Sequence, residues 1–185
     1  MSRLDDLAKR YRRNIELPWD RSIAGAQRVI TLVYDKDLER ALRGRMALFE
    51  TATQRTGAHW ALIDISDCFP RWLAKNRYCQ HYFEYPEDLE IKLESSFAKF
   101  VSQEIEAGLQ RDDVDEDTVV GLLGVGTLFG FARVSIVLNK VEPAIRGRLL
   151  VFFPGQYEDN TYRLFNARDG WNYLATPITL GAEEY

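Results

Sequence analysis

The sequence predicts an open α/β fold, with one domain over residues 1–185, a mostly parallel sheet and helices on both faces of that sheet. Strand patterns alternate with helical patterns along the chain, and this alternation requires crossover connections between parallel strands. The strand patterns are continuous apolar runs, such as VITLVY at 29–34, so both sides of each strand are expected to be covered. A chain of 185 residues, 46% of them hydrophobic, is long enough to bury one such core.

The first elements are a helix, a strand, a second helix and a second strand. Ser2 is a suitable N-cap, and the apolar residues after it recur at three- and four-residue steps, which predicts a helix that ends before Pro18. The β-branched run 29–34 predicts a buried strand. A second helical pattern covers 35–57 and leads to a strand at 59–65.

The remaining elements continue this alternation. An aromatic stretch, 69–85, contains a short helix, and Pro86 opens a longer helix that runs out near Gly108. The patterns then predict a strand at 118–125, a helix at 129–141, a strand at 149–153 closed by Pro154 and Gly155, and further strands at 162–165 and 173–178.

In an open parallel sheet, ligands bind beyond the carboxyl ends of the strands. This rule selects four loops, 35–37, 64–67, 124–130 and 154–161. Loops held by a rigid scaffold commonly carry function, and the last loop has polar side chains that can form hydrogen bonds. The candidate interaction or crevice residues from this region are Gly124, Gly126, Gly130, Arg133, Pro154, Gly155, Tyr157, Asn160 and Tyr162.

The glycine-rich loop 124–130 (GVGTLFG) follows a strand and leads into a helix, as phosphate-binding loops do. It fails at the positions that specify such a loop. The dinucleotide fingerprint requires glycine at Phe129, and a Walker loop requires lysine where this chain has Phe131. We therefore interpret the loop as a tight strand-to-helix turn, and we expect no cofactor, no metal and no catalytic residue.

The main alternative is a nucleotide- or metal-dependent regulatory protein or enzyme. It would use the glycine-rich loop together with Asp35, Asp64 and Asp67, which follow or close the first two strands. Two histidines in the whole chain offer little acid–base chemistry near neutral pH.

Charge is unevenly distributed along the chain. The whole chain carries a net charge of −4, whereas residues 1–45 carry +4 and residues 84–117 carry −9. The first predicted helix carries a basic patch of Arg3, Lys9, Arg10, Arg12 and Arg13, of which Arg10, Arg12 and Arg13 are the candidate interaction residues. Direct DNA contact is a less favoured alternative, because the overall charge is negative.

The compartment follows from what the sequence lacks. Its apolar runs are far shorter than the ~20 residues that a membrane span needs, and its first residues include no secretory signal. We therefore expect a cytoplasmic protein, in which Cys68 and Cys79 remain thiols.

The aromatic stretch 72–85 allows two interpretations. Aromatic residues are enriched in the centres of protein interfaces, which makes this stretch a candidate partner surface. Aromatic residues dominate ordinary cores as well, and this favours a core segment over a partner surface.

The C-terminal third carries motifs of a known family. Residues 121–141 (GLLGVGTLFGFARVSIVLNKV) and 146–178 (RGRLLVFFPGQYEDNTYRLFNARDGWNYLATPI) resemble the BrxB family of BREX bacteriophage-defence systems. The specific motifs are the LFGFAR segment at 128–133, the FFPGQY segment at 152–157, and Asn172-Tyr173. The order of elements agrees with the family over nearly the whole chain.

This resemblance implies that the protein works within a BREX defence system, but it does not imply a particular reaction. BREX clusters combine a DNA methyltransferase, a large ATPase, a PglZ protein similar to alkaline phosphatases, and small accessory proteins. The family resembles a non-catalytic accessory component, with other BREX proteins as its expected partners and the PglZ-like protein first among them. Its expected fold is a degenerate P-loop ATPase-like domain without Walker motifs.

Overall fold

A computed structural model describes residues 2–167 and 170–180 of the chain. The strands in this part are β1 (Val29–Tyr34), β2 (His59–Asp64), β3 (Thr118–Leu123), β4 (Arg148–Glu158), β5 (Thr161–Leu164) and β6 (Thr176–Ile178). The α-helices are α1 (Arg3–Ile15), α2 (Glu39–Gly44), α3 (Ala47–Gln54), α4 (Cys68–Lys75), α5 (Cys79–Glu84), α6 (Glu87–Lys92), α7 (Ala98–Leu109) and α8 (Val134–Val141).

The centre of the molecule is a mostly parallel sheet. Its strands lie in the order β2-β3-β4-β1-β6, and every neighbouring pair in this row is parallel, while β5 forms an antiparallel hairpin with the end of β4. Parallel neighbours require crossover connections, so the predicted α/β class is confirmed. The likeness to P-loop domains stays a prediction.

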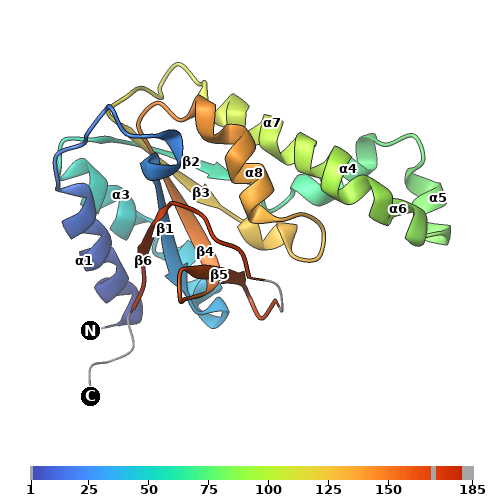
Figure 1. Ribbon diagram of the computed structural model, residues 1–185, viewed down its shortest axis with the longest axis horizontal. Helices are drawn as coiled ribbons and strands as arrows, with labels where there is room; N and C mark the ends of the chain where they lie inside the picture. The colour runs from blue at the N-terminus through green and yellow to red at the C-terminus, as the bar shows by residue number, and fades with distance from the viewer. Residues whose placement is uncertain (1, 168–169, 181–185) are drawn as a thin grey trace.

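Helices cover both faces of this sheet, as predicted (Figure 1). α1 and α3 pack on one face, while α7 and α8 pack on the other. Strand β1 shows the division, because Ile30 and Leu32 belong to the core under α1 and α3, whereas Val29 and Val33 belong to the core under α7 and α8. All of β1 is buried, as expected for a strand whose two sides are both covered.

Helix α1 begins at a capping box. The Ser2 hydroxyl accepts a hydrogen bond from the Asp5 backbone N–H at 3.3 Å, and the Asp5 carboxylate accepts one from the Ser2 N–H at 3.0 Å. Arg45 donates to the same carboxylate at 2.7 Å, which joins the start of α1 to the segment before α3. Further along, the buried Tyr11 hydroxyl lies 2.5 Å from the Thr53 hydroxyl of α3.

Protonation of Asp5 is expected to weaken this cap. Hydrogen bonds from Ser2, with a further contribution from Arg45, lower the pKa of the Asp5 carboxyl from its ordinary 3.8 to about 2. The charged form therefore stabilises the folded chain above pH ~4, and this contribution is lost as the pH falls through about 2. We expect Asp5→Asn to have a lower free energy of unfolding than the unmodified chain above pH ~4. This difference is expected to become smaller as the pH falls toward about 2, as measured by urea denaturation. A loss that does not change with pH would contradict this role.

Helices α4, α5 and α6 form an arm that projects beyond the sheet (Figure 1). α6 continues into α7 through one π-helical turn, Leu93–Phe97, so the helix predicted from Pro86 to Gly108 joins the arm to the body. At the base of the arm, Phe97 is fully buried among the rings of Phe69, Trp72 and Phe131.

The second predicted helix, 35–57, is divided in the structure. It begins with a 3-10 turn, Lys36–Leu38, continues as α2 and breaks at Arg45 before α3 begins. Arg45 leaves the helical conformation, with φ −124° and ψ 24°, and its guanidinium binds Ser2 and Asp5. The break thus serves a contact with α1, which the apolar periodicity of 35–57 does not reveal.

Two other predicted boundaries were wrong. The helix predicted at 129–141 begins only with α8, because Gly130 takes the left-handed φ of +75° and the chain turns there. The strand predicted at 173–178 is reduced to β6, which pairs with β1. None of the helices in the described part of the chain is long and apolar enough to cross a membrane.

Candidate functional site

Polar side chains meet at the carboxyl edge of the sheet, where ligands are expected in folds of this class. Arg43 of α2 is the centre of this group. Its Nε lies 2.7 Å from Glu39 Oε1, and its Nη1 lies 3.0 Å from Asp64 Oδ2 at the end of β2. Its Nη2 donates to the Ser66 hydroxyl at 2.6 Å, and the Tyr34 hydroxyl at the end of β1 donates to Glu39. We call these five residues the strand-end cluster.

The strand-end cluster contains two carboxyl groups and one guanidinium, which bind one another. Partial burial acts to raise the pKa of Asp64, but hydrogen bonds from Ser66 and Arg43 outweigh it, so the pKa lies below its ordinary value. Burial, reinforced by the Glu39 carboxylate, raises the pKa of Tyr34. The carboxyl groups of Glu39 and Asp64 share the Arg43 guanidinium, and this arrangement fastens α2 to the ends of β1 and β2.

The three aspartates that the enzyme alternative would use each bind a different partner. Asp64 binds Arg43 and Ser66, Asp35 accepts a hydrogen bond from the Asp37 N–H at 2.9 Å, and Asp67 lies 3.4 Å from Arg71. Within residues 2–167 and 170–180, no group of three or more His, Cys, Asp and Glu side chains is placed to hold a metal ion.

The glycine-rich loop 124–130 is a tight turn, as interpreted from the sequence. It leads into a single 3-10 turn, Val125–Leu128, and not directly into an α-helix. Gly124 has φ +90°, and a Cβ at this position would lie 2.4 Å from the Ser66 hydroxyl oxygen. A Cβ on Gly126 would lie 2.7 Å from an aromatic ring. Gly124 therefore requires glycine for both its backbone conformation and its packing, whereas a Cβ on Gly126 would only require the neighbouring ring to move.

The predicted loop 154–161 is a β-hairpin. β4 continues beyond Pro154 and pairs with β5, so the expected end of the strand at Pro154 and Gly155 is wrong. The register explains the change: parallel pairing with β1 ends at Pro154, and antiparallel pairing with β5 begins at Gly155. Asp159 and Asn160 form the turn with φ of 48° and 60°, as two-residue hairpin turns require.

The aromatic residues of this hairpin lie partly in the core. The Tyr157 hydroxyl donates to Asn160 at 2.9 Å on the surface. Tyr162 is fully buried, and its ring stacks on Trp171 with 5.0 Å between ring centroids. The Tyr162 hydroxyl donates to the Ala175 carbonyl at 3.3 Å, so it is not available at the surface, and burial raises its pKa to about 12.

The arginines predicted to form a basic patch lie on α1 and not at the carboxyl edge. Arg10 donates to the Thr179 carbonyl at 2.7 Å, and Arg12 pairs with Glu16 at 2.6 Å. Arg13 is exposed. Arg10 and Arg12 therefore each already have a partner within the chain.

The aromatic stretch 72–85 proves to be divided between core and surface. Trp72 and Tyr82 are buried in the arm, whereas Phe83 is 72% exposed. The arm also exposes Ile91, at 77%, which no sequence argument selected. The sequence contains one indication of this exposure: Ile91 is apolar but does not lie on the apolar face of the helix that includes Leu93.

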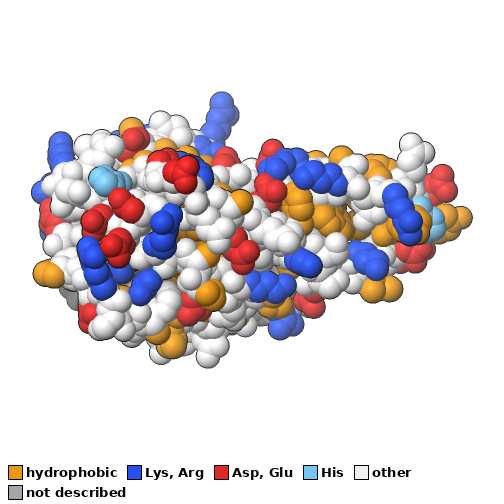
Figure 2. Space-filling model, turned by 90° about the horizontal axis from the view of Figure 1, so that it is seen from above, with side chains coloured by type: hydrophobic (Ala, Val, Ile, Leu, Met, Phe, Trp, Pro, Cys, Tyr) orange, Lys and Arg blue, Asp and Glu red, His pale blue; other side chains and the backbone are white. Residues whose placement is uncertain are grey.

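The outer end of the arm thus carries several large apolar side chains in contact with solvent. Figure 2 shows hydrophobic side chains between charged ones along this projecting part. We call them the arm surface; its members are Tyr78, Phe83, Tyr85 and Ile91. Arg133, one of the predicted residues, lies near the base of the arm, with its Nε 3.9 Å from Glu94 of the π-helical turn.

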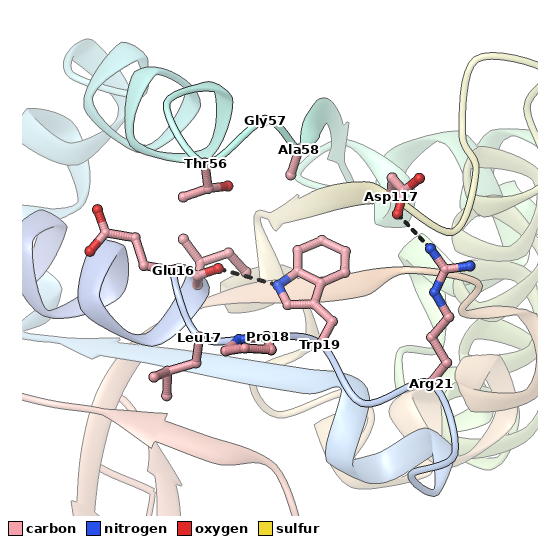
Figure 3. Close-up of a pocket in the computed structure, with 10 residues that line it drawn as sticks. Glu16, Leu17, Pro18, Trp19, Arg21, Thr56, Gly57, Ala58 and Asp117 are labelled. Carbon is pink, nitrogen blue, oxygen red and sulfur yellow. Dashed lines mark hydrogen bonds and ion pairs between the residues drawn. The ribbon is translucent and has the colours of Figure 1, made fainter.

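Two hollows lie away from the carboxyl edge. One, of about 330 Å³, is at the opposite edge of the sheet beside Trp19, whose indole N–H donates to the Ile15 carbonyl at 3.2 Å (Figure 3). Arg21 and Asp117 form an ion pair of 2.9 Å at its border. The other, of about 540 Å³, lies between α1 and α3.

These features define an α/β protein with a parallel sheet, an internally paired carboxyl edge and a projecting helical arm. The family model described as BREX protein BrxB matches residues 62–178, from β2 to β6, and so includes the arm. The match covers more than half of the chain, and the chain belongs to the BrxB family of BREX phage-defence systems. The match begins at residue 62, whereas the resemblance noted in the sequence suggested agreement over nearly the whole chain. No curated protein and no solved structure matches the chain significantly.

Proposed function

We propose that this chain is a non-catalytic adaptor of its BREX system, which acts by binding other BREX proteins and chiefly the PglZ-like component. The arm surface is the observation that carries the proposal. Its four large apolar side chains are exposed on α5, on α6 and in the segments that flank α5, and their burial against a partner protein would be favourable.

The position of these side chains supports docking. Phe83 and Ile91 lie on α5 and α6 at the outer end of the arm, where the sheet and its covering helices do not block access (Figure 1). Aromatic residues are favoured in the centres of interfaces, and the arm surface contains three of them.

The strand-end cluster supports a non-catalytic role. A carboxyl group that acts as a general acid or base needs an environment that leaves it able to exchange protons near neutral pH. Asp64 and Glu39 are instead paired with Arg43, and the hydrogen bonds of Asp64 keep its pKa low.

The test is co-purification of the full chain with the PglZ-like protein and, separately, with each other BREX component from the same gene cluster. In the variant Phe83→Ser/Ile91→Ser, we expect affinity for the partner to fall by about tenfold or more, because interface anchors commonly contribute over 1 kcal/mol each. Affinity is measured by surface plasmon resonance.

The matched control is Leu17→Ser/Leu174→Ser, which removes side chains that are 63% and 79% exposed but lie outside the arm. This control is expected to bind like the unmodified chain. If the unmodified chain binds no BREX component, the adaptor role is refuted. If both double variants bind equally well, the arm surface is not the docking site.

A further inference from the structure

The outer sides of α1 and α3 enclose the groove of about 540 Å³, which is separate from the arm surface and from the strand-end cluster. The floor of this groove is apolar and includes Ala8 of α1 together with Leu48 and Ala52 of α3. Ala8 and Leu48 are half-buried, and all three pack on the core between these helices and the sheet. The core therefore holds the floor residues in place, and apolar side chains of another molecule can be buried against them.

Cationic side chains border this floor. They are Lys9, Arg12, Arg45 and Arg55, and Asp5 is the one acidic residue among the described residues that line the groove. Asp5 is fixed in the α1 cap with Arg45. The Arg12–Glu16 pair is exposed, and exposed pairs of this kind contribute little to stability, so Arg12 can exchange its partner. The groove thus has a positive border, although the whole chain carries −4.

We propose that the groove between α1 and α3 binds an acidic amphipathic helix of a partner protein. Apolar side chains spaced three and four residues apart would occupy the floor, as in other helix-in-groove complexes. Glu or Asp residues beside them would pair with Arg12 and Arg55, which adds electrostatic complementarity along both borders. The inference does not depend on the arm, and it makes this face a second binding surface.

An apolar floor favours a protein helix over a nucleic acid. Binding to the phosphate backbone uses cations and hydrogen-bond donors, and a phosphate chain has no apolar groups that Leu48 or Ala52 could bury.

The test uses a fluorescein-labelled peptide of about 20 residues, long enough to form ~30 Å of helix. Its leucines recur every three to four positions, and the other positions are mostly Glu and Ala. The second probe is a scrambled peptide of identical composition, and the third is a labelled DNA duplex. Fluorescence anisotropy is measured with the full chain, with Lys9→Glu/Arg55→Glu, and with Arg13→Glu/Arg40→Glu, whose two positions are exposed and do not line the groove.

The ordered peptide is expected to bind at least about tenfold more tightly than the scrambled one, since only the ordered peptide presents a continuous apolar stripe. Lys9→Glu/Arg55→Glu is expected to lower this affinity by about tenfold or more, and the control by less than about twofold. Four results would each overturn the proposal. They are no binding of the ordered peptide, equal binding of both peptides, equal losses in both variants, and tighter binding of the DNA than of the ordered peptide. Loss of partner binding through the arm surface would leave these results unchanged.

Discussion

Replacing Gly124 with alanine is expected to lower the free energy of unfolding by about 2–5 kcal/mol, the sum of two independent effects. The φ of +90° costs a residue with a Cβ about 1–2 kcal/mol. The new Cβ would also lie 2.4 Å from the Ser66 hydroxyl and 2.8 Å from Asp64 Oδ1, and relief of such overlap commonly costs about 1–3 kcal/mol. Urea denaturation followed by circular dichroism measures the loss.

Gly130→Ala is the matched control for this substitution. Gly130 has a comparable φ of +75°, but nothing lies within 4 Å of the position that its Cβ would occupy. Only the conformational cost of about 1–2 kcal/mol is therefore expected. Equal losses in the two variants would show that the strand-end cluster does not press against Gly124.

The sheet could be predicted from the sequence because each buried strand leaves a local pattern. The run 29–34 is apolar except at Thr31, and the structure buries every one of these residues between two layers of helices. The break between α2 and α3 left no such pattern. It depends on Arg45 reaching Ser2 and Asp5, which are about 40 positions earlier in the chain, and a periodicity within 35–57 does not contain that contact.

The candidate site was predictable only in part. The glycine loop was correctly interpreted as a turn, because the residues that define phosphate-binding loops can be checked one by one in the sequence. Arg43 was missed, since its role comes from the meeting of Glu39, Asp64 and Ser66 at one edge of the sheet. Ile91 was missed because exposure is a property of the folded chain, and isoleucine is usually buried.

Replacing Phe97 with alanine is expected to lower the free energy of unfolding by about 3–5 kcal/mol, as for other fully buried phenylalanines. The ring lies at the base of the arm, with centroid distances of 5.4 Å to Trp72 and 5.5 Å to Phe69. Its removal leaves a cavity where α4 meets the π-helical turn. The control, Phe83→Ala, removes a ring that is 72% exposed and is expected to change stability by less than about 0.5 kcal/mol.

The same substitution also tests whether the arm works as a rigid element. Phe97 is buried and cannot touch a partner, yet a loosened arm would present Phe83 and Ile91 in many orientations, and ordering them on binding costs free energy. We therefore expect Phe97→Ala to weaken partner binding and Phe97→Leu, which fills most of the volume, to restore it. Surface plasmon resonance at a temperature where all variants remain folded separates this effect from unfolding. Full binding by Phe97→Ala would mean that the arm surface needs no support from the ring cluster at its base.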